Sequence, residues 1–401
     1  MSAKNEISLY CNWNLYIDTD GSVWLPSVHA QYIKALKNIG FNKITLTSKV
    51  CTKKTEEHDY HFKKNEIEII SIAYFSSYLT AFTKLPSIIR AFYKQARKKT
   101  NYCYIRTYEP FIWLLVLFQK VFSRKTKLYM HYISDPKSAI FSNATSSKLK
   151  KVLRYAVFLP EYYLTNISSI FCNVSSNGPV PIKNTPFFVR ERIKEVIESA
   201  LLDSDINQAI ALESRFNSTK STSSPIDILY VGYIRPSKGI NILVDAVKLL
   251  ADENIKNFKV TIIGSGEYIT TIKKIISEHA LESYFTFKGY IPFSNNLFQN
   301  YISTDVFINL SPSETGPRVL LEAGIFNCYL ISTKVGYSKR IVNENNGILI
   351  DINDSLQAKN AIRESIRVIE EYRFHKKNMN IYSELSCYTT ENFFKNVLQL
   401  N

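Results

Sequence analysis

The sequence lacks the cysteine patterns of metal sites and disulfide frameworks. Its six cysteines lie far apart, with no Cys-x-x-Cys pair and no histidine cluster beside them, so neither a structural zinc site nor a disulfide framework is expected. They are Cys11, Cys51, Cys103, Cys172, Cys328 and Cys387. We therefore expect buried, reduced cysteines in a cytoplasmic protein with no metal and no cofactor.

Long apolar runs and a secretory leader are also lacking. The longest strongly apolar run, Phe111–Phe118, is much shorter than the roughly 20 residues that a membrane-spanning helix needs. The segment that starts at Met1 has no basic-then-apolar signal pattern. We therefore expect no integral membrane protein, whereas contact with a membrane surface stays open.

What the chain does have is an uneven charge. Its 401 residues include 50 Lys+Arg and 35 Asp+Glu, a formal net charge of +15, and its 45% hydrophobic content excludes a wholly disordered chain. Residues 1–200 contain 29 basic and 14 acidic residues, whereas residues 201–401 contain 21 of each. The whole excess lies in the first half, which predicts an anionic partner for that half.

Short β-branched or aromatic runs alternate with helical patterns along both halves. In the first half we predict strands over 7–12, 43–47, 66–73, 102–106 and 127–132, and helices over 22–38, 85–98, 110–122 and 189–199. In the second half we predict strands over 226–231, 259–263, 284–287, 305–310, 328–332 and 347–350, with a helix over 241–250. This alternation predicts parallel sheets with helices on both faces.

A polar segment, Asn217–Pro225, interrupts the pattern as an exposed linker would. We expect an N-terminal domain over 1–205, a linker over 206–225, a second domain over 226–375, and a C-terminal helical segment over 376–401 that packs back on the first domain. Two such domains predict a ligand site in the cleft between them.

The first motif that carries chemistry is Tyr230-Val-Gly-Tyr-Ile-Arg-Pro-Ser-Lys-Gly239. It leads from a strand through a basic turn to a helix, whose N-terminal amides and dipole favour anions. Arg235 and Lys238 in that turn suit a phosphate or diphosphate. An ordinary strand–turn–helix with solvated charges is the alternative.

A second motif, Ile262-Ile-Gly-Ser-Gly-Glu267, contains Gly264 and Gly266 but not the third glycine of a dinucleotide fingerprint. It favours a plain tight turn over a phosphate cradle.

The strongest motif runs from Leu310 to Ala323, where a strand ends and a helix is expected to begin at Pro317. Glu314 falls on the loop and Glu322 on the helix, so both carboxylates are expected near the helix N-terminus. The backbone N–H groups of 316–319, Pro317 excepted, suit a phosphate, and the carboxylates suit sugar hydroxyls. A nucleoside-diphosphate sugar meets both requirements. A loop acid with an unrelated helix-surface glutamate is the alternative.

These motifs, in this order, resemble the family 4 retaining glycosyltransferases (glycosyl transferases group 1) of bacterial surface-polysaccharide type. The likeness covers residues 226–351, from Tyr230-Val-Gly and the Lys238-Gly239 turn through the Glu-x7-Glu pair. Lys288-Gly-Tyr290, Val335-Gly336 and Asn345–Ile350 also follow in the expected order. The resemblance implies the GT-B architecture, an α/β fold of two Rossmann-like doubly wound domains facing an interdomain cleft.

The resemblance also implies roles for particular residues. Lys238 and a nearby arginine bind the donor diphosphate, Glu314 contacts the sugar and Glu322 holds the ribose. The family often has Gly-Arg where this chain has Gly232-Tyr233, so Arg235 is expected to supply the charge from another backbone position. The expected donor-binding residues are Gly21, Gly232, Arg235, Lys238, Gly264, Gly266, Glu314, Gly316, Pro317, Arg318, Val319 and Glu322.

The first half matches the family more loosely. Gly21 corresponds to one glycine of the usual glycine-rich loop, and the segment Tyr129–Pro136 resembles a histidine segment that faces the donor. His131 is therefore expected to contact the donor sugar near the reacting carbon, with Asp135 as a neighbour. His131, Arg235, Lys238 and Glu314 form the expected catalytic set. For His131 a purely structural role is the alternative.

The basic first half is expected to face the acceptor and an anionic membrane. Ile88–Lys99, Lys148–Arg154 and the aromatic-rich Tyr155–Tyr163 combine cationic and apolar positions, which suits lipid headgroups. A solvated helix face is the alternative for each segment.

Together these features predict a retaining, metal-independent hexosyltransferase. Its donor is a nucleotide sugar, with UDP and GDP both open, and its acceptor is a saccharide, lipid-linked, in lipopolysaccharide, O-antigen or capsule biosynthesis. We expect it to be peripheral on the inner face of the cytoplasmic membrane and to bind no nucleic acid. A catalytically inactive sugar-binding or scaffold subunit, an inverting enzyme of the same architecture and a basic nucleic-acid-binding protein are the alternatives.

Overall fold

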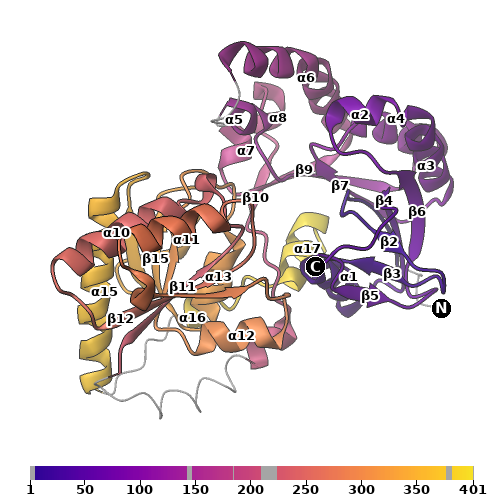
Figure 1. Cartoon of the computed structure of the whole chain (residues 1–401). Coiled ribbons are helices and arrows are strands. Elements are labelled where there is room, and N and C mark those ends of the chain that lie inside the picture. The colour runs from indigo at the N-terminus through magenta and orange to yellow at the C-terminus, as the bar shows by residue number, and fades with distance from the viewer. Residues whose placement is uncertain (1–4, 142–146, 184, 209–223, 376–381, 401) are drawn as a thin grey trace. The chain divides into compact units, whose positions relative to one another are not determined.

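The computed structural model describes residues 5–141, 147–183, 185–208, 224–375 and 382–400, and the chain divides into two compact units (Figure 1). The first unit consists of Met1–Ile197 with Thr390–Asn401, and the second of Glu198–Thr389. The division at 197/198 precedes the predicted domain end at 205. Most of the predicted linker (209–223) and part of the predicted C-terminal segment (376–381) lie outside the described residues.

The first unit is built on a parallel seven-stranded sheet of order β10-β9-β8-β7-β1-β4-β6. Its strands are β1 (Glu6–Tyr10), β4 (Lys43–Val50), β6 (Glu68–Ala73), β7 (Tyr102–Thr107), β8 (Lys127–Tyr132), β9 (Asn173–Asn177) and β10 (Lys194–Val196). Its helices are α1 (Ser27–Asn38), α2 (Tyr78–Phe82), α3 (Leu85–Arg97), α4 (Ile112–Phe122), α5 (Pro136–Phe141), α6 (Lys148–Ser168), α7 (Val180–Lys183), α8 (Phe187–Arg190) and α17 (Thr390–Leu398).

Helices cover both faces of this sheet. On one face α3 and α4 bury Phe92 and Leu115 against the strands. On the other face, the α17 side chain Phe394 packs against Tyr32 of α1 and Tyr104 of β7, with ring centroids 5.8 and 5.5 Å apart. The last helix of the chain therefore belongs to the core of the first unit.

Two predicted helices of the first unit are wrong in part. The helix predicted over 22–38 begins only at Ser27, because β3 (Val23–Leu25) joins β2 (Tyr16–Ile17) and β5 (Tyr60–Phe62) in a small antiparallel sheet. The helix predicted over 189–199 is instead the end of α8 followed by β10, which pairs with β9 at the sheet edge. In both places strand pairing with a distant segment overrides the local helical pattern.

The second unit is built on a parallel six-stranded sheet of order β13-β12-β11-β14-β15-β16. Its strands are β11 (Ile226–Val231), β12 (Phe258–Ile263), β13 (Phe285–Gly289), β14 (Val306–Asn309), β15 (Tyr329–Thr333) and β16 (Gly347–Ile350). Its helices are α10 (Ile240–Asp252), α11 (Ile269–Glu278), α12 (Asn295–Ile302), α13 (Arg318–Ile325), α14 (Ser338–Ile341), α15 (Ser355–His375) and α16 (Tyr382–Leu385), with 3₁₀ turns η2 (Pro236–Lys238) and η3 (Glu282–Tyr284).

This second sheet is also covered on both faces. Leu243 and Val247 of α10 and Ile362 of α15 are fully buried in one core with alternate residues of the strands. The intervening Phe307 of β14 packs against Tyr301 of α12 on the other face, with ring centroids 5.9 Å apart. The two doubly wound parallel sheets confirm the predicted α/β class.

The strand order reverses once in each sheet. The reversal falls between β11 and β14 in the second unit and between β1 and β7 in the first. In open parallel sheets the crevice outside the carboxyl ends of the strands at such a switch point is the usual ligand site. Among the described residues, no helix is long and apolar enough to cross a membrane.

Candidate functional site

Two loops meet at the switch point of the second unit. One follows β11 and runs to Gly239, and the other follows β14 and runs to Pro317. Lys238 of the first loop forms an ion pair with Glu314 of the second, and the two side chains are 24% and 17% exposed. Ser311 Oγ donates a hydrogen bond to the Ser237 carbonyl at 3.3 Å. The structure thus brings together Lys238 of the first predicted motif and Glu314 of the strongest one.

Gly239 lets these two loops approach closely. It has φ +73°, and a Cβ built on it would lie 2.0 Å from the Leu310 carbonyl oxygen. Any side chain there would therefore clash with backbone at the end of β14. This glycine places Lys238, at the end of η2, directly beside the Glu314 loop.

The predicted glycine pair after β12 lies beside the same β11 loop. A Cβ on Gly264 would lie 1.9 Å from the Gly232 carbonyl oxygen, and one on Gly266 would lie 2.2 Å from that of Ile234. The Ile234 amide in turn donates to the Ser265 carbonyl at 2.8 Å. Gly264 and Gly266 therefore allow the loops after β11 and β12 to pack closely together. This agrees with the prediction of a plain tight turn for this motif.

Arg235 stands at the start of η2, and its guanidinium lies 5.7 Å from the centre of the Tyr233 ring. Burial raises the pKa of Tyr230, and Glu314 raises it further, whereas Arg235 lowers it. The charges of Arg235 and Glu314 thus both act on the Tyr230 phenol. Arg235 supplies a cation at this loop although Tyr233 occupies the expected arginine position.

Glu322 has different surroundings from Glu314. It lies on α13 with only 4% exposure and accepts a hydrogen bond from the Tyr301 hydroxyl at 2.8 Å. Burial raises the pKa of Glu322, partly offset by that hydrogen bond and by Arg318. The two carboxylates of the motif therefore have separate partners.

The N-terminus of α13 offers fewer amides than expected. Pro317 has no N–H, and the Arg318 amide donates to the Gly316 carbonyl at 3.0 Å, so it points into its own turn. Of the predicted anion-holding amides, those of Gly316 and Val319 remain candidates. Gly336 supports the loop from behind, since a Cβ on it would lie 2.5 Å from the Thr315 carbonyl oxygen.

The predicted residues of the first unit have different surroundings from one another: His131 lies in the core, Gly21 in a hairpin, and Asp135 on the loop that follows β8. His131 on β8 is 0% exposed, with Nδ1 2.9 Å from Ser175 Oγ and its ring 5.1 Å from that of Phe393. These are the surroundings of a core histidine. Gly21 sits in the hairpin between β2 and β3 with φ +83°, not in a loop that follows a parallel strand. Asp135 is buried and accepts from the Lys137 amide at 3.2 Å.

A pocket that the sequence did not reveal lies at the carboxyl ends of strands in the first unit. Its volume is about 460 Å³. Glu109, which follows β7 at the switch point, accepts a hydrogen bond from Asn12 Nδ2 at 2.6 Å. Lys49, Arg154, Phe75, Ser76, Ser77, Tyr78, Tyr108, Pro110, Ser134, Pro136, Ile140 and Phe158 also line the pocket. A carboxylate among aromatic rings suits a hydroxyl-rich ligand with apolar faces.

Burial shapes the charges of this pocket. It raises the pKa of Glu109, partly offset by Asn12 and Arg106, and it lowers the pKa of Lys49. Behind the wall, Glu161 accepts from the Phe111 amide at 2.8 Å and from the Tyr78 hydroxyl at 3.2 Å, and burial raises its pKa to about 7. Glu109, three residues after the predicted strand 102–106, was the signal that could have revealed this pocket.

Comparison with known proteins gives one family and one fold. The model of the family "Glycosyl transferases group 1" matches residues 213–379. A curated relative, the phosphatidylinositol N-acetylglucosaminyltransferase GPI3 subunit of Saccharomyces cerevisiae (strain YJM789), is 22% identical over 247 residues, 60% of this chain and 52% of that protein. The chain thus spans about half the length of the curated relatives it matches.

Solved structures match over almost the whole chain. Sucrose-phosphate synthase from Thermosynechococcus elongatus has a TM-score of 0.64 at 15% identity, covering 99% of this chain and 97% of that one. Anabaena Alr3699/HepE in complex with UDP-glucose has a TM-score of 0.63 at 14% identity, and the match covers 98% of each chain. The lipopolysaccharide outer core galactosyltransferase WaaB has a TM-score of 0.59 at 13% identity, and the match covers 98% of this chain and 99% of that one. These matches confirm the predicted GT-B fold, and the match of the family model to residues 213–379 agrees with the predicted resemblance to glycosyl transferases group 1.

Proposed function

We propose that this chain, whose residues 213–379 belong to the glycosyl transferases group 1 family and whose fold is GT-B, moves a hexose-type sugar from a nucleoside-diphosphate sugar to a saccharide acceptor with retention of configuration. The observation that carries the proposal is the Lys238–Glu314 ion pair at the β11/β14 switch point. Lipopolysaccharide, O-antigen or capsule assembly is the biosynthetic setting, which the likeness to WaaB supports.

The donor half of this proposal rests on charge. Lys238 and Arg235 bind the diphosphate and neutralise the negative charge that grows on it as the sugar departs. Glu314, held by Lys238, accepts hydrogen bonds from the sugar hydroxyls and orients the ring, while Glu322 takes the ribose. The acceptor hydroxyl attacks the anomeric carbon from the face that the diphosphate leaves. Protein cations alone supply the stabilisation, so no metal or other cofactor is part of the proposal.

A thermal-shift panel of nucleoside diphosphates and nucleotide sugars tests the donor. The likeness to a UDP-glucose complex makes UDP sugars the first candidates, with GDP sugars beside them. A matching nucleotide at 100 times its Kd should stabilise the protein by about 2.7 kcal/mol, and Lys238→Ala should abolish most of that shift. No shift with any nucleotide would contradict the proposal, and binding without turnover would favour the inactive sugar-binding subunit.

We place the acceptor saccharide in the Glu109 pocket of the first unit. The half-buried carboxylate of Glu109, oriented by Asn12, is a strong acceptor for a sugar hydroxyl, and the rings of Tyr108 and Phe158 offer apolar walls. Glu109→Gln should raise the acceptor KM about 10-fold or more and leave the donor KM unchanged. The exposed Glu56→Gln is the matched control. An unchanged acceptor KM in Glu109→Gln would remove the acceptor from this pocket.

The membrane contact is proposed for α6, at the inner face of the cytoplasmic membrane. Leu149, Val152 and Leu153 are exposed there, Leu149 by 70%, beside the cations of Lys148–Arg154. Apolar and basic residues on one exposed helix suit an anionic lipid surface. We expect the protein to float with phosphatidylglycerol vesicles at low salt and Leu149→Ser/Leu153→Ser to float less. If the protein stayed at the bottom of the gradient and did not float with the vesicles at low salt, this contact would be contradicted.

A further inference from the structure

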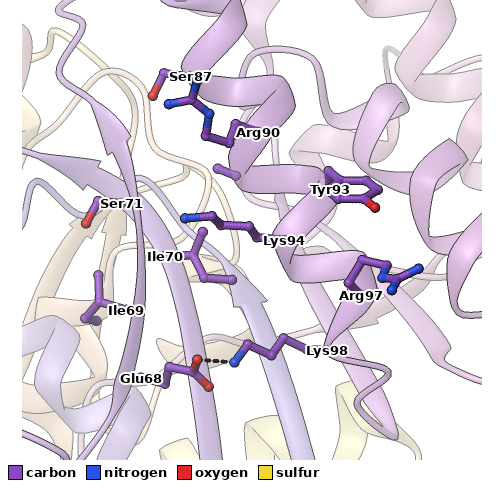
Figure 2. Close-up of a pocket in the computed structure, with 11 residues that line it drawn as sticks. Glu68, Ile69, Ile70, Ser71, Ser87, Arg90, Tyr93, Lys94, Arg97 and Lys98 are labelled. Carbon is purple, nitrogen blue, oxygen red and sulfur yellow. Dashed lines mark ion pairs between the residues drawn. The ribbon is translucent and has the colours of Figure 1, made fainter.

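A second hollow of the first unit lies on the open edge of the sheet, between β6 and α3 (Figure 2). Its volume is about 850 Å³. β6 pairs only with β4, so it is the last strand on this side of the sheet. The hollow shares no lining residue with the Glu109 pocket, and none of its residues belongs to the Lys238–Glu314 site.

Cations of α3 line this hollow between β6 and α3, which we call the edge groove. Arg90, Lys94 and Lys98 follow one another at intervals of four residues, which places them on one helix face. In Figure 2 the Lys94 side chain extends toward Ile70 of β6, Arg90 lies near Ser87, and Lys98 reaches Glu68. The stretch Leu85–Arg97 contains no acidic residue that would balance this row.

The charge of the groove is unequal at its two ends. Glu68 forms an ion pair with Lys98 and neutralises one end. Arg90 and Lys94 have no ion-pair partner anywhere in the described parts of the chain. A hollow lined by charge of one sign concentrates its field and attracts counter-ions. The end with Arg90 and Lys94 is therefore the anion-binding end.

A hydroxyl group also stands at this end. Ser87 on α3 accepts a hydrogen bond from the Ala73 amide at 3.0 Å, which leaves the Ser87 hydroxyl proton free to be donated. A guanidinium, an ammonium and a hydroxyl are donors for an anion with several acceptor oxygens. A phosphate ester has three such oxygens and up to two charges, whereas a carboxylate has two oxygens and one charge.

We propose that the edge groove is a binding site for a phosphate ester group, held by Arg90, Lys94 and Ser87. The group belongs to a phosphorylated saccharide or to a phospholipid headgroup. These two sources are named because of the proposed function. A glycosyltransferase that builds glycans on a membrane encounters phosphorylated saccharides as substrates and phospholipid headgroups at the membrane surface. The site itself does not depend on that function.

The test uses the full chain and two probes at low salt. Glucose 6-phosphate, with glucose as its uncharged control, is titrated by calorimetry, and phosphatidylglycerol vesicles, with phosphatidylcholine as control, are used in flotation. Arg90→Gln/Lys94→Gln removes two charges from the groove. Arg124→Gln/Lys125→Gln removes the same two residue types from an exposed turn and is the matched control.

We expect the groove variant to weaken binding of one probe at least 10-fold and the control variant to weaken it less than 2-fold. Loss of glucose 6-phosphate binding identifies a soluble phosphorylated saccharide, and loss confined to vesicles identifies a headgroup. The proposal is overturned if neither probe binds, or if both variants weaken binding equally or not at all. The nucleotide thermal shift, measured on the same variants, should be unchanged, so failure here is distinct from failure of the donor site.

Discussion

Lys238→Ala should lower kcat/KM for the nucleotide sugar by about 10²–10³-fold, the cost of removing one preorganised group that stabilises developing charge. The lysine is partly buried at the switch point, where water screens its charge less than at an open surface. Its loss also leaves the partly buried Glu314 carboxylate without its ion-pair partner. Steady-state kinetics with the donor identified by thermal shift measures the effect. Lys256→Ala, on an exposed loop of the same unit, should retain wild-type kinetics.

Glu314→Gln removes the charge of Glu314 but keeps the shape of its side chain, so it tests the charge of this residue in its pair with Lys238. If Lys238 and Glu314 act as one unit, the double variant should be no slower than Lys238→Ala alone, because their effects are then non-additive. Wild-type donor turnover in both single variants would refute the assignment. Simple multiplication of the two losses would show that each residue acts independently.

Gly239→Ala should remove donor turnover and destabilise the protein by about 3 kcal/mol or more. The new Cβ meets the Leu310 carbonyl oxygen at 2.0 Å in a backbone with φ +73°, so the two loops must move apart. A displacement of about 1 Å at the reacting groups is enough to cost about 100-fold in rate. Urea unfolding and donor kinetics together measure both effects.

Gly289→Ala is the control for this substitution. Gly289 has a similar φ of +69°, but nothing lies within 4 Å of the Cβ position. It should therefore cost only the backbone strain, about 1–2 kcal/mol, and leave the kinetics unchanged. Equal losses in the two variants would show that φ, and not the close approach to Leu310, decides the effect.

The meeting of the Lys238 and Glu314 loops was predictable because the signals for it are local. Lys238 and Glu314 each lie on the segment that follows a buried strand, and the carboxyl ends of parallel strands meet at one edge of a sheet. The surroundings of His131 had no local signal, because the ring that covers it, Phe393, comes from the opposite end of the chain. The Glu109 pocket was missed for a related reason. Its carboxylate is recognisable only once Asn12, Lys49 and Tyr108 are known to be its neighbours.

The helix α17 also sets the order in which this protein is completed during synthesis. The second unit, Glu198–Thr389, is continuous in sequence and can fold as soon as it leaves the ribosome, whereas the first unit needs Thr390–Asn401 to close its core. Until Phe393 and Phe394 arrive, Tyr104 and His131 lack the aromatic rings that pack on them. The half that carries the net positive charge therefore cannot close its core until residues 390–401 have been made.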